Sequence, residues 1–206
     1  MAKKQFTNAF SRYIIIIGLI MVFGGGSSML LNPNHDWMAL HLSRLGEGRQ
    51  LSSYLFNATV AFSGLAIIEL GNALARDKTW RARAKKPQQW VAHSAFRLIA
   101  LCMVGLSIFP YDKFPLVHDV FGYSMTVFYL ASVIYLTRAL RLFTPTFKRI
   151  TWGVVGVMFI MFGYYFILGN RQITLLQIQV IGLVFFFVWL ARLASGLSAQ
   201  NQRVAP

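Results

Sequence analysis

Six apolar segments of about 20 residues each limit this chain to one kind of fold. They cover residues 13–31, 51–74, 90–109, 116–140, 150–168 and 173–193. A helix of about 20 residues crosses the roughly 30 Å hydrocarbon core of a bilayer. With 56% hydrophobic and only 13% charged residues, the chain is too apolar for a soluble domain. The sequence therefore predicts an all-α polytopic membrane protein, with six transmembrane helices over 1–194 and a polar, disordered cytoplasmic tail over 195–206.

The first apolar segment has features of both a signal peptide and a membrane anchor. Lys3, Lys4 and Arg12 precede it, and Gly24-Gly25-Gly26 lies near its end. The segment is long enough to span a bilayer, so we expect an uncleaved first helix. The three glycines should either loosen its outer end or admit a close neighbour.

The basic residues are distributed unevenly between the two sides of such a bundle. Arg44, Arg49, Lys113 and Arg171 lie on one side and Arg97 lies within a span, which leaves 15 of the 20 lysines and arginines on the side of both termini. Cytoplasmic loops carry such an excess, so we expect both termini inside the cell, N-in and C-in. The short loops and the charge bias suit a bacterial plasma membrane.

The loop over 75–89 holds the densest positive charge and only one acid, Asp77. This pattern suits anionic lipid headgroups, and we expect membrane lipids as partners, with a larger membrane complex or a homo-oligomer also possible. The net charge of +14 then requires no nucleic acid. The single cysteine, Cys102, excludes an intrachain disulfide and a cysteine metal cluster, and we expect no cofactor. The basic residues of the loop are Arg76, Lys78, Arg81, Arg83, Lys85 and Lys86.

The turn over 109–119 is the polar stretch in which a chemical site is most expected. Asp112 lies within it, and His118 and Asp119 begin the fourth span. A carboxylate in a first helical turn is favoured by the helix dipole, so a structural role is sufficient for Asp119. The functional alternative is a site in which His118 acts as a base or metal ligand and Asp119 orients it.

Further site candidates lie in the first loop and the second span. His35, Asp36 and His41 are candidate metal ligands together with His118, but the two loop histidines are six residues apart and lack the i, i+4 spacing of a helical metal site. The sequence therefore assigns no metal and no catalytic residue, and His118 and Asp119 remain the catalytic candidates. The expected ligand-binding residues are Arg44, Asn57, Asp112, His118 and Asp119.

Polar groups inside the spans need partners, because an unpaired charge in a bilayer costs about 3 kcal/mol on insertion scales. Glu69 and Arg97 lie at similar depths on consecutive spans, which predicts a structural ion pair between them. Asn57, Gln177 and Gln179 are interpreted as amides that hydrogen-bond across helices.

Short motifs resemble a bacterial six-helix membrane family catalogued only as a domain of unknown function. They are Leu42-Ser43-Arg44-Leu45-Gly46, Leu55-Phe56-Asn57, Ser63-Gly64-Leu65 and Gly105-Leu106-Ser107-Ile108-Phe109-Pro110 followed by His118. That family is similar to the Frag, DRAM and Sfk group of eukaryotic membrane proteins. Its first loop commonly reads Ser-Asp-Leu-Gly, and Arg44 here takes the aspartate position. The resemblance implies a six-helix bundle with an extracytoplasmic polar cap and a lipid-related role.

Three functions remain open. The leading hypothesis is a non-enzymatic protein that binds lipid or assists a membrane complex, in which 43–57 and 109–119 pack as one unit. The alternative is a metal-dependent or acid-base lipid hydrolase or transferase centred on His118 and Asp119. The third is a small-molecule transporter, which requires a polar path from Asn57 to Glu69.

Overall fold

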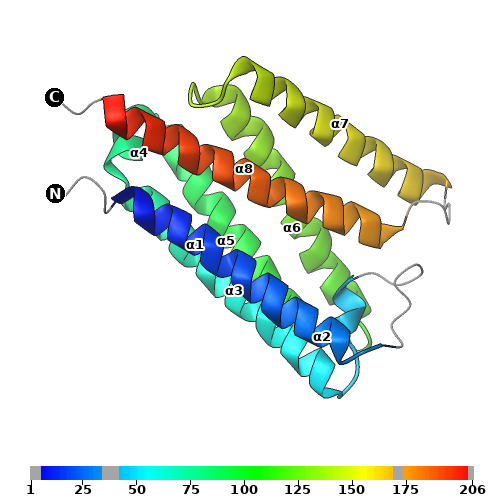
Figure 1. Ribbon diagram of the computed structural model, residues 1–206. Coiled ribbons are helices and arrows are strands. Elements are labelled where there is room, and N and C mark those ends of the chain that lie inside the picture. Colours follow the sequence, from blue (N-terminus) through cyan, green and yellow to red (C-terminus); the bar gives the residue numbers. More distant parts are fainter. Residues whose placement is uncertain (1–5, 34–41, 169–173, 204–206) are drawn as a thin grey trace.

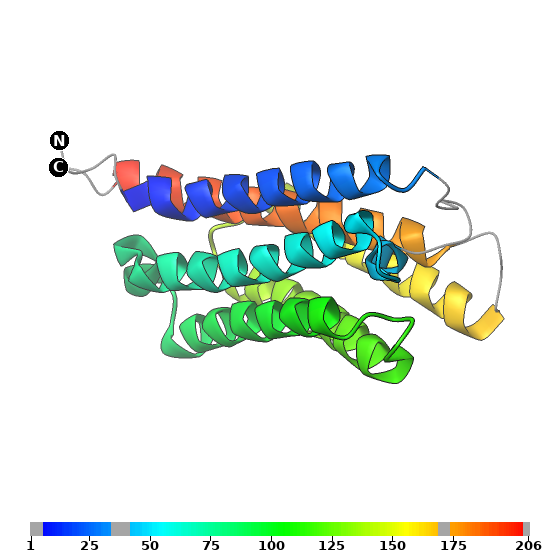
Figure 2. The same cartoon turned by 90° about the horizontal axis from the view of Figure 1, so that it is seen from below.

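The computed structural model describes residues 6–33, 42–168 and 174–203, and within these ranges the chain is helical and has no strand (Figure 1). Six helices are long and apolar enough to cross a membrane, which confirms the predicted fold class. Both ends of the chain lie at one end of the bundle, called here the terminal end (Figure 2). In chain order the elements are α1 (Phe6–Ile20), η2 (Met21–Gly25), α2 (Gly26–Leu30), η3 (Leu42–Gly46), α3 (Leu51–Arg76), α4 (Lys78–Arg83), α5 (Lys86–Ile108), α6 (Pro115–Ala139), α7 (Pro145–Leu168) and α8 (Leu175–Arg203).

The last helix extends well beyond its predicted end. The expectation of a disordered tail is wrong for residues 195–203, because α8 continues through Arg203. Leu193, Ala194 and Leu197 are buried on one face of this extension, and Gly196 lies against Leu142. The helical spacing of apolar residues thus continues past the span and holds the tail against the bundle.

The first span is a helix interrupted by one wide turn. α1 passes at Met21 into the π-helical turn η2 and resumes as α2 at Gly26. Gly24 lies against Thr59 of α3, where an added Cβ would come within 2.9 Å of the threonine methyl carbon. Beyond the turn, the Ser28 hydroxyl donates to the Ser52 carbonyl oxygen at 2.8 Å. The glycines therefore both widen the helix and admit a close neighbour.

Glycines also allow the closest helix pair of the bundle, α3 with α5. A Cβ at Gly64 would lie 3.0 Å from the Ala100 carbonyl oxygen, and one at Gly71 would lie 2.9 Å from the Phe96 Cβ. α5 packs in turn on α6, and α1 packs on α3 and α8. α7 contacts mainly its chain neighbours α6 and α8, beside which it lies in Figure 1.

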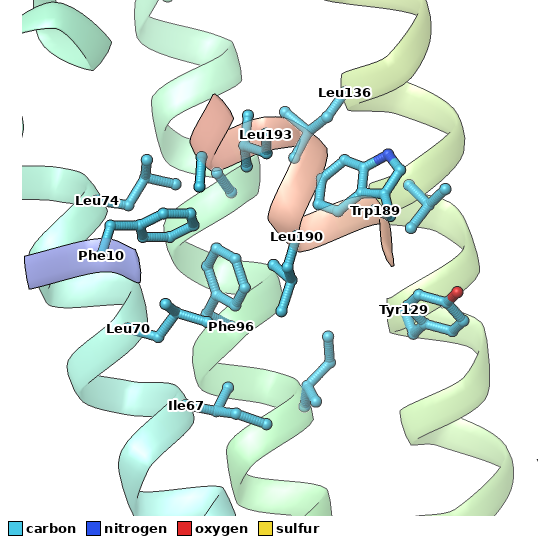
Figure 3. Packing of buried hydrophobic residues seen from close by; sticks show 14 of the residues in the cluster. Phe10, Ile67, Leu70, Leu74, Phe96, Tyr129, Leu136, Trp189, Leu190 and Leu193 are labelled. Carbon is cyan, nitrogen blue, oxygen red and sulfur yellow. The ribbon is translucent and has the colours of Figure 1, made fainter. Parts of the chain in front are cut away.

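Large apolar side chains from several helices meet in the core of the bundle (Figure 3). Trp189 and Leu190 of α8 are about 1% and 0% exposed and lie among side chains from the neighbouring helices. The Trp189 indole nitrogen donates to the Thr137 hydroxyl at 2.9 Å, so this buried polar pair is satisfied. The labelled neighbours are Phe10, Ile67, Leu70, Leu74, Phe96, Tyr129, Leu136 and Leu193.

The basic loop at the terminal end is folded rather than extended. Asp77 caps α4 by accepting the Trp80 N–H at 2.8 Å, and Trp80 is buried beneath it. The Gln88 amide donates to the Ala139 carbonyl oxygen at 3.2 Å and joins α5 to the end of α6. The six basic side chains of the loop remain exposed.

Candidate functional site

Two polar segments, residues 42–50 and 109–114, fold together over the end of the bundle opposite the termini. We call them the cap. The Gly48 N–H donates to a carboxylate oxygen of Asp112 at 3.2 Å. The Arg44 guanidinium lies over the Tyr111 ring, 5.4 Å from its centroid. The expected contact between the first loop and the 109–119 turn is thus confirmed.

The conformation of residues 47–50 depends on glycine and on local side-chain bonds. Gly48 has φ +80°, a region that L side chains rarely adopt. The Ser53 hydroxyl donates to the Glu47 carbonyl oxygen, and the Glu47 carboxylate lies 3.4 Å from the Arg44 Nε. Burial raises the pKa of Glu47, and the nearby Asp112 raises it further, while Arg44 and His118 act in the opposite direction.

His118 ties the head of α6 to the end of α5. Its ring is 5% exposed, and Nδ1 lies 2.8 Å from the Phe109 carbonyl oxygen. A carbonyl oxygen only accepts, so Nδ1 carries a proton and is the donor. The Tyr111 ring packs edge-on against the imidazole, with the centroids 5.7 Å apart. The predicted role of Asp119 in orienting His118 is therefore wrong, since the backbone carbonyl orients the ring.

Two amides of the spans attach the first loop rather than joining helices to each other. The Asn57 side-chain nitrogen donates to the Gly46 carbonyl oxygen at 3.0 Å. The Gln179 side-chain oxygen accepts the Leu42 N–H at 3.0 Å and links η3 to α8. Gln177 instead caps its own helix with Thr174, at 3.1 and 3.3 Å. The predicted helix-to-helix role of these amides is corrected accordingly.

A cavity of about 240 Å³ lies beneath the cap, enclosed by α1, α3, α5, α6, α7 and α8. Most of its lining is apolar and includes Ile17, Ile67, Met103, Met158 and Phe186. Its polar lining comes chiefly from η3, from the capped end of α3 and α6, and from the start of α8. These polar residues are Ser43, Asn57, His118, Asp119, Tyr123, Thr126 and Gln179.

The cavity reaches the surface of the bundle beside α7. Tyr123, which lines it, is 40% exposed and meets Phe166 of α7 edge to face at 5.5 Å. At the deep end lies Tyr129, which is 8% exposed and whose hydroxyl has no hydrogen-bond partner among the described residues. Tyr129 is ten residues further along α6 than Asp119, or about 15 Å at 1.5 Å per residue.

The structure brings together some of the predicted site residues. Asn57, His118 and Asp119 line the cavity, whereas Arg44 and Asp112 belong to the cap above it. The candidate metal ligands His35, Asp36 and His41 lie outside the described residues. Within the described part of the chain, no three histidine, cysteine, aspartate or glutamate side chains gather around one point.

The predicted ion pair between Glu69 and Arg97 is not formed. Glu69 accepts a hydrogen bond from the Asn72 side chain at 3.0 Å, one turn further along α3. Arg97 is on the exposed face of α5, away from the glycine contacts that join α3 and α5. Among the described residues, the one ion pair within 4.0 Å is that of Arg44 with Glu47.

Several lining residues were not predicted from sequence. Tyr123, Tyr129, Met158 and Phe186 lie in uniformly apolar spans, where nothing in the sequence distinguishes a cavity wall from a packed core or a lipid-facing side. Gln179 did carry a signal, because a polar residue within a span requires a partner.

Six apolar helices that bury little of their surface in one another, with a polar cap at one end, define a multi-pass α-helical membrane protein. The chain belongs to the family described as "Protein of unknown function (DUF998)", whose match covers residues 15–196. The matched region contains the whole cap and every described residue that lines the cavity. Neither a curated protein nor a solved structure matches the chain.

Proposed function

We propose that this protein is a non-enzymatic membrane protein that binds one small amphiphile in the cavity beneath the cap. The observation that carries the proposal is the two-part lining, polar next to the cap and apolar below it. Such a division matches a molecule with one polar end and one hydrocarbon end. Ligand sites in proteins have this character, with an apolar wall and a few polar groups that fix orientation.

The size of the cavity limits the ligand. Its volume of about 240 Å³ exceeds the roughly 150 Å³ of an apolar cavity that accepts benzene. It falls below the roughly 300 Å³ at which pockets for drug-sized molecules begin. A single hydrocarbon chain or a small ring system fits this volume, whereas a lipid with two acyl chains does not.

The Tyr129 hydroxyl supports the proposal from the deep end. A buried hydroxyl without a partner costs about 1–3 kcal/mol, and such groups in native proteins call for an explanation. Tyr129 lies against the cavity, so a water held at the deep end, beside the hydrocarbon end of the ligand, is within range of its hydroxyl. Glu69, by contrast, is not among the described lining residues, which favours binding over a polar transport path.

The orientation and location that we propose follow from charge. With the terminal end in the cytoplasm, the exposed basic loop 75–89 faces the inner leaflet and the cap faces outward. In this arrangement the basic loop binds anionic lipid headgroups of a bacterial plasma membrane. The likeness to the Frag, DRAM and Sfk group belongs to the same proposal and supports a lipid-related role.

A photoactivatable, neutral dodecanol bearing a diazirine tests the proposed site. The protein is placed in nanodiscs of zwitterionic lipid, irradiated with the probe and mapped by mass spectrometry. We expect labelling to concentrate on lining residues of α6 and α8. Gly122→Leu should abolish it, because Gly122 lines the cavity and has room for a Cβ, 3.8 Å from Leu106.

Gly153→Leu is the matched control, since Gly153 is exposed on α7 and nothing lies within 4 Å of its added Cβ. The probe should label the Gly153→Leu variant to the same extent and at the same residues as the unchanged protein. Labels spread evenly over lipid-facing side chains, and equal in the Gly122→Leu variant, would refute the proposed binding site.

A further inference from the structure

The charge on the cavity lining is of one sign. Asp119 is the only acid among the described lining residues, and these include no lysine or arginine. The Asp119 carboxylate is partly buried and forms neither a hydrogen bond nor an ion pair with any described residue. A carboxylate withdrawn from water is costly unless a cation or water accompanies it.

The basic residue next to the lining residue Ser43 is already engaged elsewhere. Arg44 follows Ser43, which lines the cavity, but its guanidinium lies over the Tyr111 ring and 3.4 Å from Glu47. These contacts hold the Arg44 guanidinium in the cap, where it is paired with Glu47. The remaining donors of the lining are neutral hydroxyls and amides, which do not compensate the charge of an anionic ligand.

The surroundings of Asp119 are suited to a positive charge. Tyr123 lies one helical turn further along α6, on the same face as Asp119, and places an aromatic ring beside the carboxylate. A cation over an aromatic face gains about 0.5–2 kcal/mol. His118 also lines the cavity, and its Nδ1 is held by the Phe109 carbonyl.

From this geometry we infer that the amphiphile bound in the cavity carries an ammonium head, with Asp119 as its counter-ion and the hydrocarbon chain directed along α6 toward Tyr129. The inference rests on the proposed function and names the class of its ligand. An alkyl amine, with a pKa near the roughly 10.4 of lysine, is a cation at neutral pH. A head bearing only phosphate or sulfate would meet Asp119 with like charge.

Competition against the diazirine dodecanol in nanodiscs tests the inference. The competitors share one chain length and differ in the head: dodecylamine, dodecanol, dodecyl sulfate and a lysophosphatidylethanolamine. The partition of each competitor into nanodiscs without protein is measured, and its apparent potency is corrected for this partition. We expect dodecylamine to compete about tenfold better than dodecanol, a difference worth about 1.4 kcal/mol, and dodecyl sulfate to compete worst.

Asp119→Asn should bring dodecylamine and dodecanol to nearly equal potency while the neutral probe still labels the cavity. Glu69→Gln makes the same carboxylate-to-amide change on α3, outside the lining, and should keep the tenfold ratio. Better competition by the lysophosphatidylethanolamine than by dodecylamine would support the ammonium site and assign a lipid headgroup as its source. The reverse order would support it and assign a simple amine.

The unfavourable results separate the two proposals. If Asp119→Asn keeps the preference for the amine, or if dodecyl sulfate competes best, the ammonium site is refuted while cavity binding of the neutral probe stands. If the neutral probe fails to label the cavity in the unchanged protein, the proposed function fails and the ammonium inference fails with it.

Discussion

The Nδ1 atom of His118 lies 2.8 Å from the carbonyl oxygen of Phe109, so the first turn of α6 is bound to the residue that ends α5. The two residues enclose the turn that carries Tyr111 and Asp112, both of which contact the first loop. A buried histidine thus positions the cap and also lines the cavity.

His118→Ala should lower the thermal stability of the protein. The change removes a hydrogen bond worth about 1 kcal/mol and leaves a space in a site that is 95% buried, given the 5% exposure of the ring. His118→Gln should lose less thermal stability, because the glutamine amide can still donate to the Phe109 carbonyl. Circular dichroism during heating in detergent measures both. His93→Ala is the control, since the His93 Nδ1 has no partner among the described residues, and an equal loss there would contradict this role of His118.

Asp112→Ala should loosen the cap without unfolding the bundle. The Gly48 N–H loses its acceptor at 3.2 Å, a partly exposed contact worth about 1 kcal/mol. Hydrogen exchange followed by mass spectrometry should show faster exchange over residues 42–50 and no change in α3 and α5. Lys113→Ala, at the adjacent exposed position, should leave exchange unaltered. Unchanged protection of 42–50 in the Asp112→Ala variant would exclude Asp112 as the link between the two segments.

The raised pKa of Glu47 makes the stability of the cap depend on pH. Burial is the main cause, and it favours the protonated carboxyl in the folded state. The folded protein therefore binds more protons than the unfolded chain between the ordinary carboxyl pKa of 4.5 and the raised pKa, so stability falls as pH rises through this interval. Glu47→Gln should gain stability relative to the unchanged protein at neutral pH, and this gain should shrink toward acid pH. A pH-independent difference in melting temperature would contradict the assignment.

Cysteine labelling tests the proposed orientation. The native Cys102 is 4% exposed and should react little. Lys113→Cys places a thiol in the cap, and Lys85→Cys places one in the basic loop, both at exposed positions. A membrane-impermeant maleimide should label the first variant in intact cells and the second only after lysis, since basic loops remain in the cytoplasm. The opposite pattern would reverse the proposed topology.

The sequence was sufficient to predict the six spans and the cap because each has a local physical cause, whereas α4, within the basic loop, was not predicted. Span length and hydropathy locate six helices, and Pro115 and Asp77 lie at helix starts, where their residue types are favoured. The contact between the first loop and the 109–119 turn was also predictable, because both follow helices that end on the same side of the membrane.

The cavity and the partners of individual polar groups were not predictable. The polar residues of α6 do not gather on one face, so its sequence does not show that Tyr123 and Tyr129 face a cavity while Leu136 is packed in the core. Glu69 and Arg97 were expected to pair because they lie at similar depths along consecutive helices. Depth does not show in which direction around the helix axis each side chain points. That direction is set by the glycine contacts of Gly64 and Gly71 with α5.

The π-helical turn in the first span sets the direction that its last residues face. Each residue of an α-helix advances about 100° around the axis, so the extra residue of a wide turn rotates everything that follows it relative to what precedes it. Phe10 and Ile17 face the core before the turn, and after it Ser28 meets the start of α3. Deleting one residue from Met21–Gly25 would keep the span long enough to cross the bilayer while turning Ser28 away from Ser52. A length change too small to affect membrane insertion would thus separate the end of the first span from the start of α3.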